Sequence, residues 1–330
     1  MNDNPLLRPR RLFAFGAVIL SLVSWMTRPP PLTLQTDVRT LERKAEMGNS
    51  FAQFLLGRRL REGDGVPQDD AAAFRWFLTA AQHGEVPAQN DLGVAYALGK
   101  GTPRDELEAT KWFRAAAESG DATGQDNLGS RYTHGLGVPQ DDNEALRWFL
   151  KSAHQGSPAG QVDAGIAYTD GRGTPINYTE ALKWFRLAAE KGDPKGLLDL
   201  GVMYENGNGV VQDYEQARTL YARAAAVGNA TAEHNLCRLY RFGLGMSKDG
   251  ALAREWCTKA ADQGNKNARQ DLDTWTAHGT TAVAASSREL PQRQIPGTTP
   301  PPDRAGCPAL DLTRLGSPNV DPSFKLCLLN

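Results

Sequence analysis

The sequence predicts an all-α protein, a right-handed α-solenoid built from antiparallel helix pairs, and three observations lead to this fold class. A set of residues recurs every 36 positions without an insertion. Each copy carries two stretches of 3.6-residue apolar periodicity, separated by glycines and prolines. The partial copies that flank the array are polar where the complete copies are apolar. Together these observations indicate repeat units that stack side by side.

The 36-residue period is clearest at the leucine–glycine pair of residues 56–57. The same pair, or a close substitute, recurs at residues 92–93, 128–129, 164–165, 200–201 and 236–237. Twenty residues after each leucine position stands an aromatic residue in five of the six copies: Trp76, Trp112, Trp148, Trp184 and Trp256, with Leu220 in the fifth copy. Six complete copies therefore occupy residues 49–264.

Each copy reads as two helices, and the second copy shows why. Leu92 and Tyr96 lie on one stripe of a first helix, which Gly99 ends because glycine adopts the left-handed conformation at little cost. Asp105 with Glu108 forms a capping box that begins the second helix. Glycine on the first helix and alanines on the second let the two backbones approach closely. A single pair has no core of its own, so each pair needs its neighbours.

The organisation of the whole chain follows from the array. The sequence predicts a solenoid of fourteen helices over residues 37–279, made of a capping helix (37–48), the six repeats and a second capping helix (265–279). Residues 280–330 are rich in proline, serine and threonine, and they cannot bury enough apolar surface to offset the entropy of ordering. We expect this tail to be flexible.

The consensus of the copies is A-x-x-x-L-G-x-x-Y-x-x-G-x-G-V-P-x-D-x-x-x-A-x-x-W-F-x-x-A-A-x-x-G-D/N. It resembles the Sel1-like repeat, a relative of the tetratricopeptide repeat with a longer turn. The resemblance covers roughly three-quarters of the chain. It implies a scaffold for other proteins, in envelope signalling, secretion or surface assembly. Repeats five and six depart from the pattern, because Val211 and Ser247 replace the proline of the turn.

The N-terminal residues 1–28 have the layout of an export signal. The basic stretch at residues 8–11 precedes an uncharged apolar run at residues 12–26, and a proline-rich linker follows at 29–36. A helix over this run would span roughly 22 Å, short of the roughly 30 Å hydrocarbon core, yet no small-x-small cleavage pattern follows. We expect an uncleaved signal anchor, with a removed signal peptide as the alternative. Either places the repeats outside the cytoplasm, anchored in the inner membrane and facing the periplasm, or free in the periplasm.

The four cysteines point to the same compartment. Cys237 occupies the packing-glycine position and Cys257 the aromatic position of one repeat, equally far from a turn near residue 247. We expect these two to form a disulfide, with two buried free thiols as the alternative. Cys307 and Cys327 could close a small loop in the tail. Both bridges would need an oxidising compartment.

Composition and motifs argue against nucleic-acid binding, catalysis and metal or cofactor binding. The 37 basic and 38 acidic residues nearly cancel, so we expect no nucleic-acid partner. The histidines are scattered, without HExxH or a Cys/His cluster, and neither GxSxG nor SxxK occurs. We therefore expect no catalytic residue, cofactor or metal site, and no enzymatic activity.

Two alternatives to a scaffold remain open. Cysteine-rich relatives of the family suggest a penicillin- or peptidoglycan-binding protein with weak β-lactamase-like activity, although this chain has one cysteine pair in the array where those relatives have one per repeat. The other alternative is a luminal adaptor of a eukaryotic secretory pathway.

A partner should bind at positions where the repeat consensus does not fix the residue type. Three positions of each first helix, two before, two after and five after the leucine position, lie about 160° from the packing stripe. Related helical-repeat proteins line a concave groove with these positions. Here they are Phe54, Arg58, Arg61, Asn90, Val94, Ala97, Asp126, Ser130, Thr133, Val162, Ile166, Thr169, Leu198, Val202, Glu205, His234, Arg238 and Arg241.

This groove varies in chemistry along the array. The run Val162, Ile166, Leu198 and Val202 is apolar and predicts that the groove holds an extended or helical peptide of a partner protein. We expect Arg58, Arg61, Arg238 and Arg241 to bind acidic groups of that partner. The alternative is that these residues only cover neighbouring helices. We expect the chain itself to be a monomer.

Overall fold

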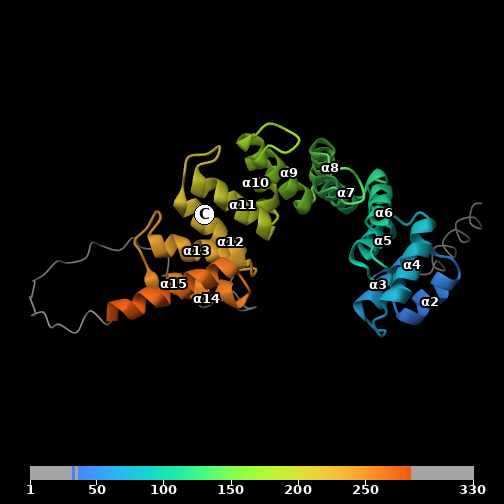
Figure 1. Cartoon of the computed structure of the whole chain (residues 1–330). Coiled ribbons are helices and arrows are strands. Elements are labelled where there is room, and N and C mark those ends of the chain that lie inside the picture. Colours follow the sequence, from blue (N-terminus) through green and yellow to red (C-terminus); the bar gives the residue numbers. More distant parts are fainter. Residues whose placement is uncertain (1–31, 34–35, 284–330) are drawn as a thin grey trace, which may run out of the picture. The chain divides into compact units, whose positions relative to one another are not determined.

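The structure is a computed structural model that describes residues 32–33 and 36–283, with side chains up to residue 275 (Figure 1). These residues form fourteen α-helices and no strand. In chain order the helices are α2 (Val38–Glu46), α3 (Ser50–Glu62), α4 (Asp70–Gln82), α5 (Val86–Leu98), α6 (Glu106–Glu118), α7 (Ala122–His134), α8 (Asp142–His154), α9 (Pro158–Asp170), α10 (Tyr178–Glu190), α11 (Pro194–Asn206), α12 (Tyr214–Ala225), α13 (Ala230–Phe242), α14 (Gly250–Asp262) and α15 (Lys266–Val283).

Three sequence-based expectations lie outside the described residues: the apolar run at 12–26, most of the tail at 280–330, and the pair Cys307 and Cys327. Within the described part of the chain, no helix has both the length and the apolar character that a membrane span requires.

Capping residues begin and end the helices as the sequence predicts. Oδ1 of Asp105 accepts from the backbone N–H of Glu108 at 3.0 Å. Gly99 follows α5 in the left-handed conformation, with φ of 67°, and its N–H donates to the carbonyl of Ala95. The short turns between helices are thereby fixed by local hydrogen bonds.

The chain divides into two compact units, and the boundary follows Trp112 inside α6. In the first unit, α2 packs on α3, α3 on α4, and α4 on α5. The core between these helices contains the fully buried Leu41, Phe77 and Leu92. No helix of this unit buries its apolar stripe without the next helix.

The second unit continues the same arrangement from α7 to α15, each helix packing on the next. First helices of neighbouring repeats also contact each other, α7 with α9, α9 with α11, and α13 with α15. Its largest core cluster runs from Val162 to Cys257, with Tyr221 fully buried. Consecutive packed helix pairs confirm the predicted all-α solenoid.

A small residue facing an aromatic ring joins the two helices of a repeat. A Cβ added to Gly165 would lie 2.5 Å from Cε1 of Phe185, closer than carbon atoms can approach. In the sixth repeat both positions are cysteine, and Cys237 and Cys257 form a disulfide with their Cα atoms 5.2 Å apart. There a covalent bond replaces the packing of a ring against the backbone.

The last helix differs from the expectation. The second capping helix was expected to end at Gly279, whereas α15 continues to Val283. A glycine inside a helix costs only about 1 kcal/mol, and no proline follows until Pro291 to stop the helix. The glycine signal alone is too weak to end this helix.

Candidate functional site

The groove positions lie on the first helices α3, α5, α7, α9, α11 and α13, and most of their side chains are half-buried. Five positions are exceptions, because their side chains are buried: Phe54, Ala97, Val162, Glu205 and His234. Val162, at 1% exposed, lies in the core of the second unit. The expectation that these five side chains line an open groove is therefore wrong. Ile166, Leu198 and Val202 pack against the same core but remain partly exposed. Three of the four apolar residues are thus accessible to a partner.

In the first unit, the two predicted arginines are bound to carboxylates of the chain itself. Arg58 lies 3.2 Å from Glu62, and Nη1 of Arg61 lies 3.0 Å from Oδ2 of Asp91. The guanidinium of Arg61 also lies 5.4 Å from the centroid of the Phe77 ring. Burial raises the pKa of the Asp91 carboxyl, and Arg61 opposes that rise. On α5, Asn90 and Val94 are partly buried.

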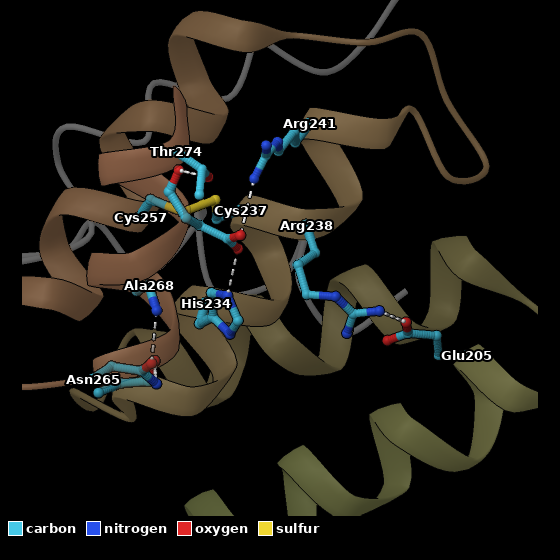
Figure 2. A network of polar contacts seen from close by, with 11 residues as sticks. Glu205, His234, Cys237, Arg238, Arg241, Cys257, Asn265, Ala268 and Thr274 are labelled. Atoms are coloured by element: carbon cyan, nitrogen blue, oxygen red, sulfur yellow. Dashed lines mark hydrogen bonds and ion pairs between the residues drawn. A yellow bond between two sulfur atoms is a disulfide. The ribbon is translucent and has the colours of Figure 1, made fainter. Parts of the chain in front are cut away.

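The second unit holds Arg238 in a similar pair (Figure 2). Its Nη2 lies 3.2 Å from Oε1 of Glu205, and the hydroxyl of Tyr221 donates to Oε2 of the same carboxylate at 2.7 Å. Burial, followed by this hydrogen bond, raises the pKa of Tyr221. Glu205 is 9% exposed, so it joins α11, α12 and α13 from inside the unit and is not free to bind a partner.

The cap α15 supplies the carboxylate for the last arginine. Nη1 of Arg241 lies 3.0 Å from Oδ1 of Asp271, and Nε2 of His234 lies 2.9 Å from Oδ2 (Figure 2). The guanidinium of Arg241 is 4.8 Å from the centroid of the Trp275 ring. All four arginines that we expected to bind acidic groups of a partner are therefore already paired within the chain. Their positions were predicted, but the chain itself supplies the acids: Arg58 pairs within its own helix, and the other three arginines pair with carboxylates of neighbouring first helices.

A series of aspartates on the same helices was not among the predicted site residues. Aspartate stands immediately before the leucine position in α5, α9, α11 and α15, as Asp91, Asp163, Asp199 and Asp271. This recurrence at the repeat period was the available signal. In the second unit, the charge of Asp163 acts on both Asp199 and the predicted groove residue Asp126, so Asp126, Asp163 and Asp199 form one acidic series.

Burial and mutual repulsion change the acidity of this series. Burial, with the charge of Asp163 as a second cause, raises the pKa of Asp126 to about 7. Burial raises the pKa of Asp199 to about 6. Nζ of Lys195 lies 3.1 Å from Oδ1 of Asp163 and opposes both shifts. Oδ1 of Asp126 and Oδ2 of Asp199 are buried without a hydrogen-bond partner.

Beside these aspartates a cavity of about 180 Å³ opens between α7, α8 and α9. Its lining includes Thr133, Asp142, Phe149, Asp163, Ile166 and Arg172. The first unit has a second cavity of about 160 Å³, lined among others by Arg61, Asp70, Phe77, Asp91, Val94 and Lys100. Each of these six residues stands 72 positions before its counterpart in the first set. The two cavities are therefore the same feature of the repeat, formed once in each unit.

Metal chemistry finds no support in the described part of the chain, where no group of three or more His, Cys, Asp or Glu side chains is arranged to hold an ion.

Constant helix pairs at a 36-residue step, with a variable surface on the first helices, define a helical-repeat protein. The profile of the Sel1 repeat matches residues 50–85, 86–121, 122–157, 158–193, 194–229 and 230–265. The chain belongs to the Sel1 repeat family, whose members are generally scaffolds for protein–protein interaction. Its repeats begin one residue later than the boundaries predicted from the sequence.

A solved structure with the same fold supports the assignment. A Sel1 repeat protein from Oxalobacter formigenes is 29% identical, with a TM-score of 0.62, over 75% of this chain and 96% of that chain. A protective antigen of uropathogenic Escherichia coli that displays the same repeat fold is 34% identical, with a TM-score of 0.47, over 71% of this chain and 58% of that chain. No curated protein matches the chain.

Proposed function

We propose that this protein is an exported scaffold that binds a peptide segment of another protein on the face formed by its first helices. The observation that carries the proposal is the adjacency of Ile166 on α9 with Leu198 and Val202 on α11. These side chains are apolar and partly exposed, and their two helices are in contact. A contiguous apolar surface on neighbouring helices is typical of a peptide-binding groove.

Charge substitution tests this surface. Val202→Glu should abolish crosslinking to the partner, because burying a carboxylate against an apolar peptide segment is unfavourable. Val211→Glu is the matched control, since Val211 is 88% exposed in the turn before α12. Crosslinking in intact cells followed by mass spectrometry would identify the partner, and the binding of that purified partner would then be measured. Equal binding by both variants, with unchanged circular dichroism melting curves, would contradict the proposal.

We further propose that the repeats lie in an oxidising compartment, as an inner-membrane-anchored or free periplasmic domain. The Cys237–Cys257 disulfide supports this proposal, because such bonds persist mainly outside the reducing cytosol. Alkylation of thiols in acid-quenched cells tests it. Full labelling of Cys237 and Cys257 before reduction would exclude the compartment.

We propose a non-enzymatic role, in line with the family. No observation on the described residues favours the hydrolase or the luminal adaptor. Incubation of the purified full chain with nitrocefin is the direct check, and turnover that co-purifies with the protein would overturn this part of the proposal.

A further inference from the structure

The first unit shows how an arginine can lie against the wall of this cavity, which keeps a volume of about 160 Å³ beside it. In the first unit, the side chain of Arg61 lies in the lining of the cavity. Its guanidinium pairs with Asp91 at 3.0 Å and lies over the ring of Phe77, 5.4 Å from the centroid. Phe77 is 1% exposed. Arginine is suited to this position because a planar cation can pair with a carboxylate and stack on a ring at once.

The same ion pair occurs again 180 residues later. Arg241 occupies the position of Arg61 in its helix and pairs at 3.0 Å with Asp271, which occupies the position of Asp91. Arg241 also lies over an aromatic ring, that of Trp275. Arginine paired with the aspartate of the next first helix is thus a recurring solution within this array.

The cavity of the second unit keeps the aspartate and the ring but lacks the arginine. Thr133 stands where the first unit has Arg61, and its hydroxyl donates to the carbonyl of Gly129 in its own helix at 3.2 Å. Asp163 and Phe149 take the places of Asp91 and Phe77, and Phe149 is 6% exposed. Asp163 pairs instead with Lys195, a largely exposed side chain on α11.

The remaining charged groups leave the cavity acidic. Oδ1 of Asp142 is buried without a hydrogen-bond partner, whereas its counterpart Asp70 lies 3.8 Å from Lys100. Arg172, the counterpart of Lys100, is paired with Asp170 at 2.8 Å. His134 also lines the cavity, and its Nδ1 lies 2.8 Å from the carbonyl oxygen of Ser130.

We propose that the cavity between α7, α8 and α9 binds an arginine side chain of a partner protein, whose guanidinium pairs with Asp163 and stacks on Phe149. This inference rests on the proposed scaffold function, and it names the side chain by which the partner protein is held. The volume of about 180 Å³ suits one side chain, since pockets for drug-sized ligands have about 300–1,000 Å³. Ala145 and Ile166 supply an apolar wall for the methylene groups of the arginine.

The probe for this cavity is Nα-acetyl-arginine amide, and its neutral isostere Nα-acetyl-citrulline amide is the control ligand. Both are titrated into the full chain, with backbone amide NMR shifts as the readout. We expect saturable shifts at residues 130–134 and 163–167 for the arginine ligand alone, with a Kd on the order of 10 mM, as suits a contact by a single side chain. Equal binding of citrulline, or no saturation by the arginine ligand, would overturn the proposal.

Two variants remove the expected arginine site by different means. Asp163→Asn should weaken arginine binding at least about tenfold, because it removes the charged partner of the cation. Thr133→Arg should abolish binding, because its guanidinium would pair with Asp163 as that of Arg61 pairs with Asp91. Thr258→Arg is the matched control, since Thr258 is exposed on α14 and also donates to its own helix, to the carbonyl of Arg254. Binding that survives in Thr133→Arg, with an unchanged melting temperature, would overturn the inference.

The reciprocal variant tests the comparison between the two cavities. Arg61→Thr removes the internal partner of Asp91 in the first unit and should add a second set of shifts, around Phe77 and Asp91. An unchanged set of shifts in a folded Arg61→Thr protein would count against an arginine site of this geometry.

These titrations use a small ligand, so they are independent of the identity of the partner. If arginine fails to bind while Val202→Glu still loses the partner, the anchor is wrong and the scaffold function stands. If arginine binds as expected while Val202→Glu retains the partner, the cavity stands and the proposed apolar surface fails.

Discussion

The first and second units form the same packing but treat the charges on their first helices differently. Both use a glycine against an aromatic ring within a repeat, Gly57 against Phe77 in the first and Gly129 against Phe149 in the second. In the first unit, Arg61 pairs with Asp91 of the next first helix. At the equivalent position in the second unit, Thr133 carries no charge. The aspartates of α7, α9 and α11 therefore have one exposed lysine, Lys195, to offset their charges. Repetition therefore conserves the positions that make the core and leaves the first-helix surface free to diverge.

A second difference lies at the end of the second unit. The pair α13–α14 is joined by the Cys237–Cys257 disulfide, whereas α3 and α4 are held by packing alone at these positions. A chain closed across a sequence separation of 20 residues loses unfolded-state entropy worth about 3 kcal/mol.

The largest expected effect follows from that bond. Replacing both Cys237 and Cys257 with alanine should lower the free energy of unfolding of the second unit by about 3 kcal/mol. Hydrogen exchange followed by mass spectrometry measures this unit by unit, and peptides from α13 and α14 should exchange faster while peptides from α3 to α5 stay unchanged. Equally faster hydrogen exchange in both units would show that they unfold together. The disulfide would then not distinguish the second unit from the first.

The next effect concerns the pH dependence of the second unit. Burial raises the pKa of Asp126 from 3.8 to about 7, so between these values the folded state binds more protons than the unfolded state. Stability from this group is therefore present below about pH 4 and is lost as the pH rises toward 7. The first unit has Asn90 at the same position of its repeat.

Asp126→Asn gives the second unit the residue of the first unit, and it should remove the loss of stability at high pH. We expect the free energy of unfolding to rise by on the order of 2 kcal/mol at pH 8. This is roughly half of the value that the full pKa shift would give, because the carboxyl keeps some contact with water. No gain is expected at pH 4. Urea titrations at both pH values measure it, and a gain that is equal at pH 4 and pH 8 would rule out the protonation argument.

The smallest effect separates two equivalent aspartates of the cavity linings, Asp91 and Asp163. Asp91→Asn should cost the first unit about 1 kcal/mol, because the half-buried Arg61 loses its main carboxylate. Asp163→Asn should change stability by less than about 0.5 kcal/mol, because Lys195 is exposed and the repulsion with Asp126 disappears. Thermal unfolding of the two variants gives the comparison. A larger loss of stability for Asp163→Asn than for Asp91→Asn would mean that the ion pair with Lys195 stabilises the fold at least as much as the ion pair between Arg61 and Asp91.

Much of the fold could be predicted from the sequence, because each signal is local. The capping residue Asp105 and the turn residue Gly99 act within a few residues of their own helix, and the structure places both as expected. The disulfide also followed from register, since Cys237 and Cys257 fall on two positions that touch in repeats one, three, four and five. The end of α15 was missed because a single glycine is a weak signal.

The candidate site could be predicted only in part. The sequence by itself determined the helices, the period, the contact between the glycine and aromatic positions, and which side of each first helix carries variable residues. Only the tertiary structure decided that Val162 is buried, that Arg61 and Arg241 are already paired, and that Asp163 lines a cavity in which threonine stands at the position of Arg61. The physical reason is that helical periodicity fixes the direction of a side chain on its own helix, whereas exposure, charge pairing and pKa depend on what the next repeat places opposite it.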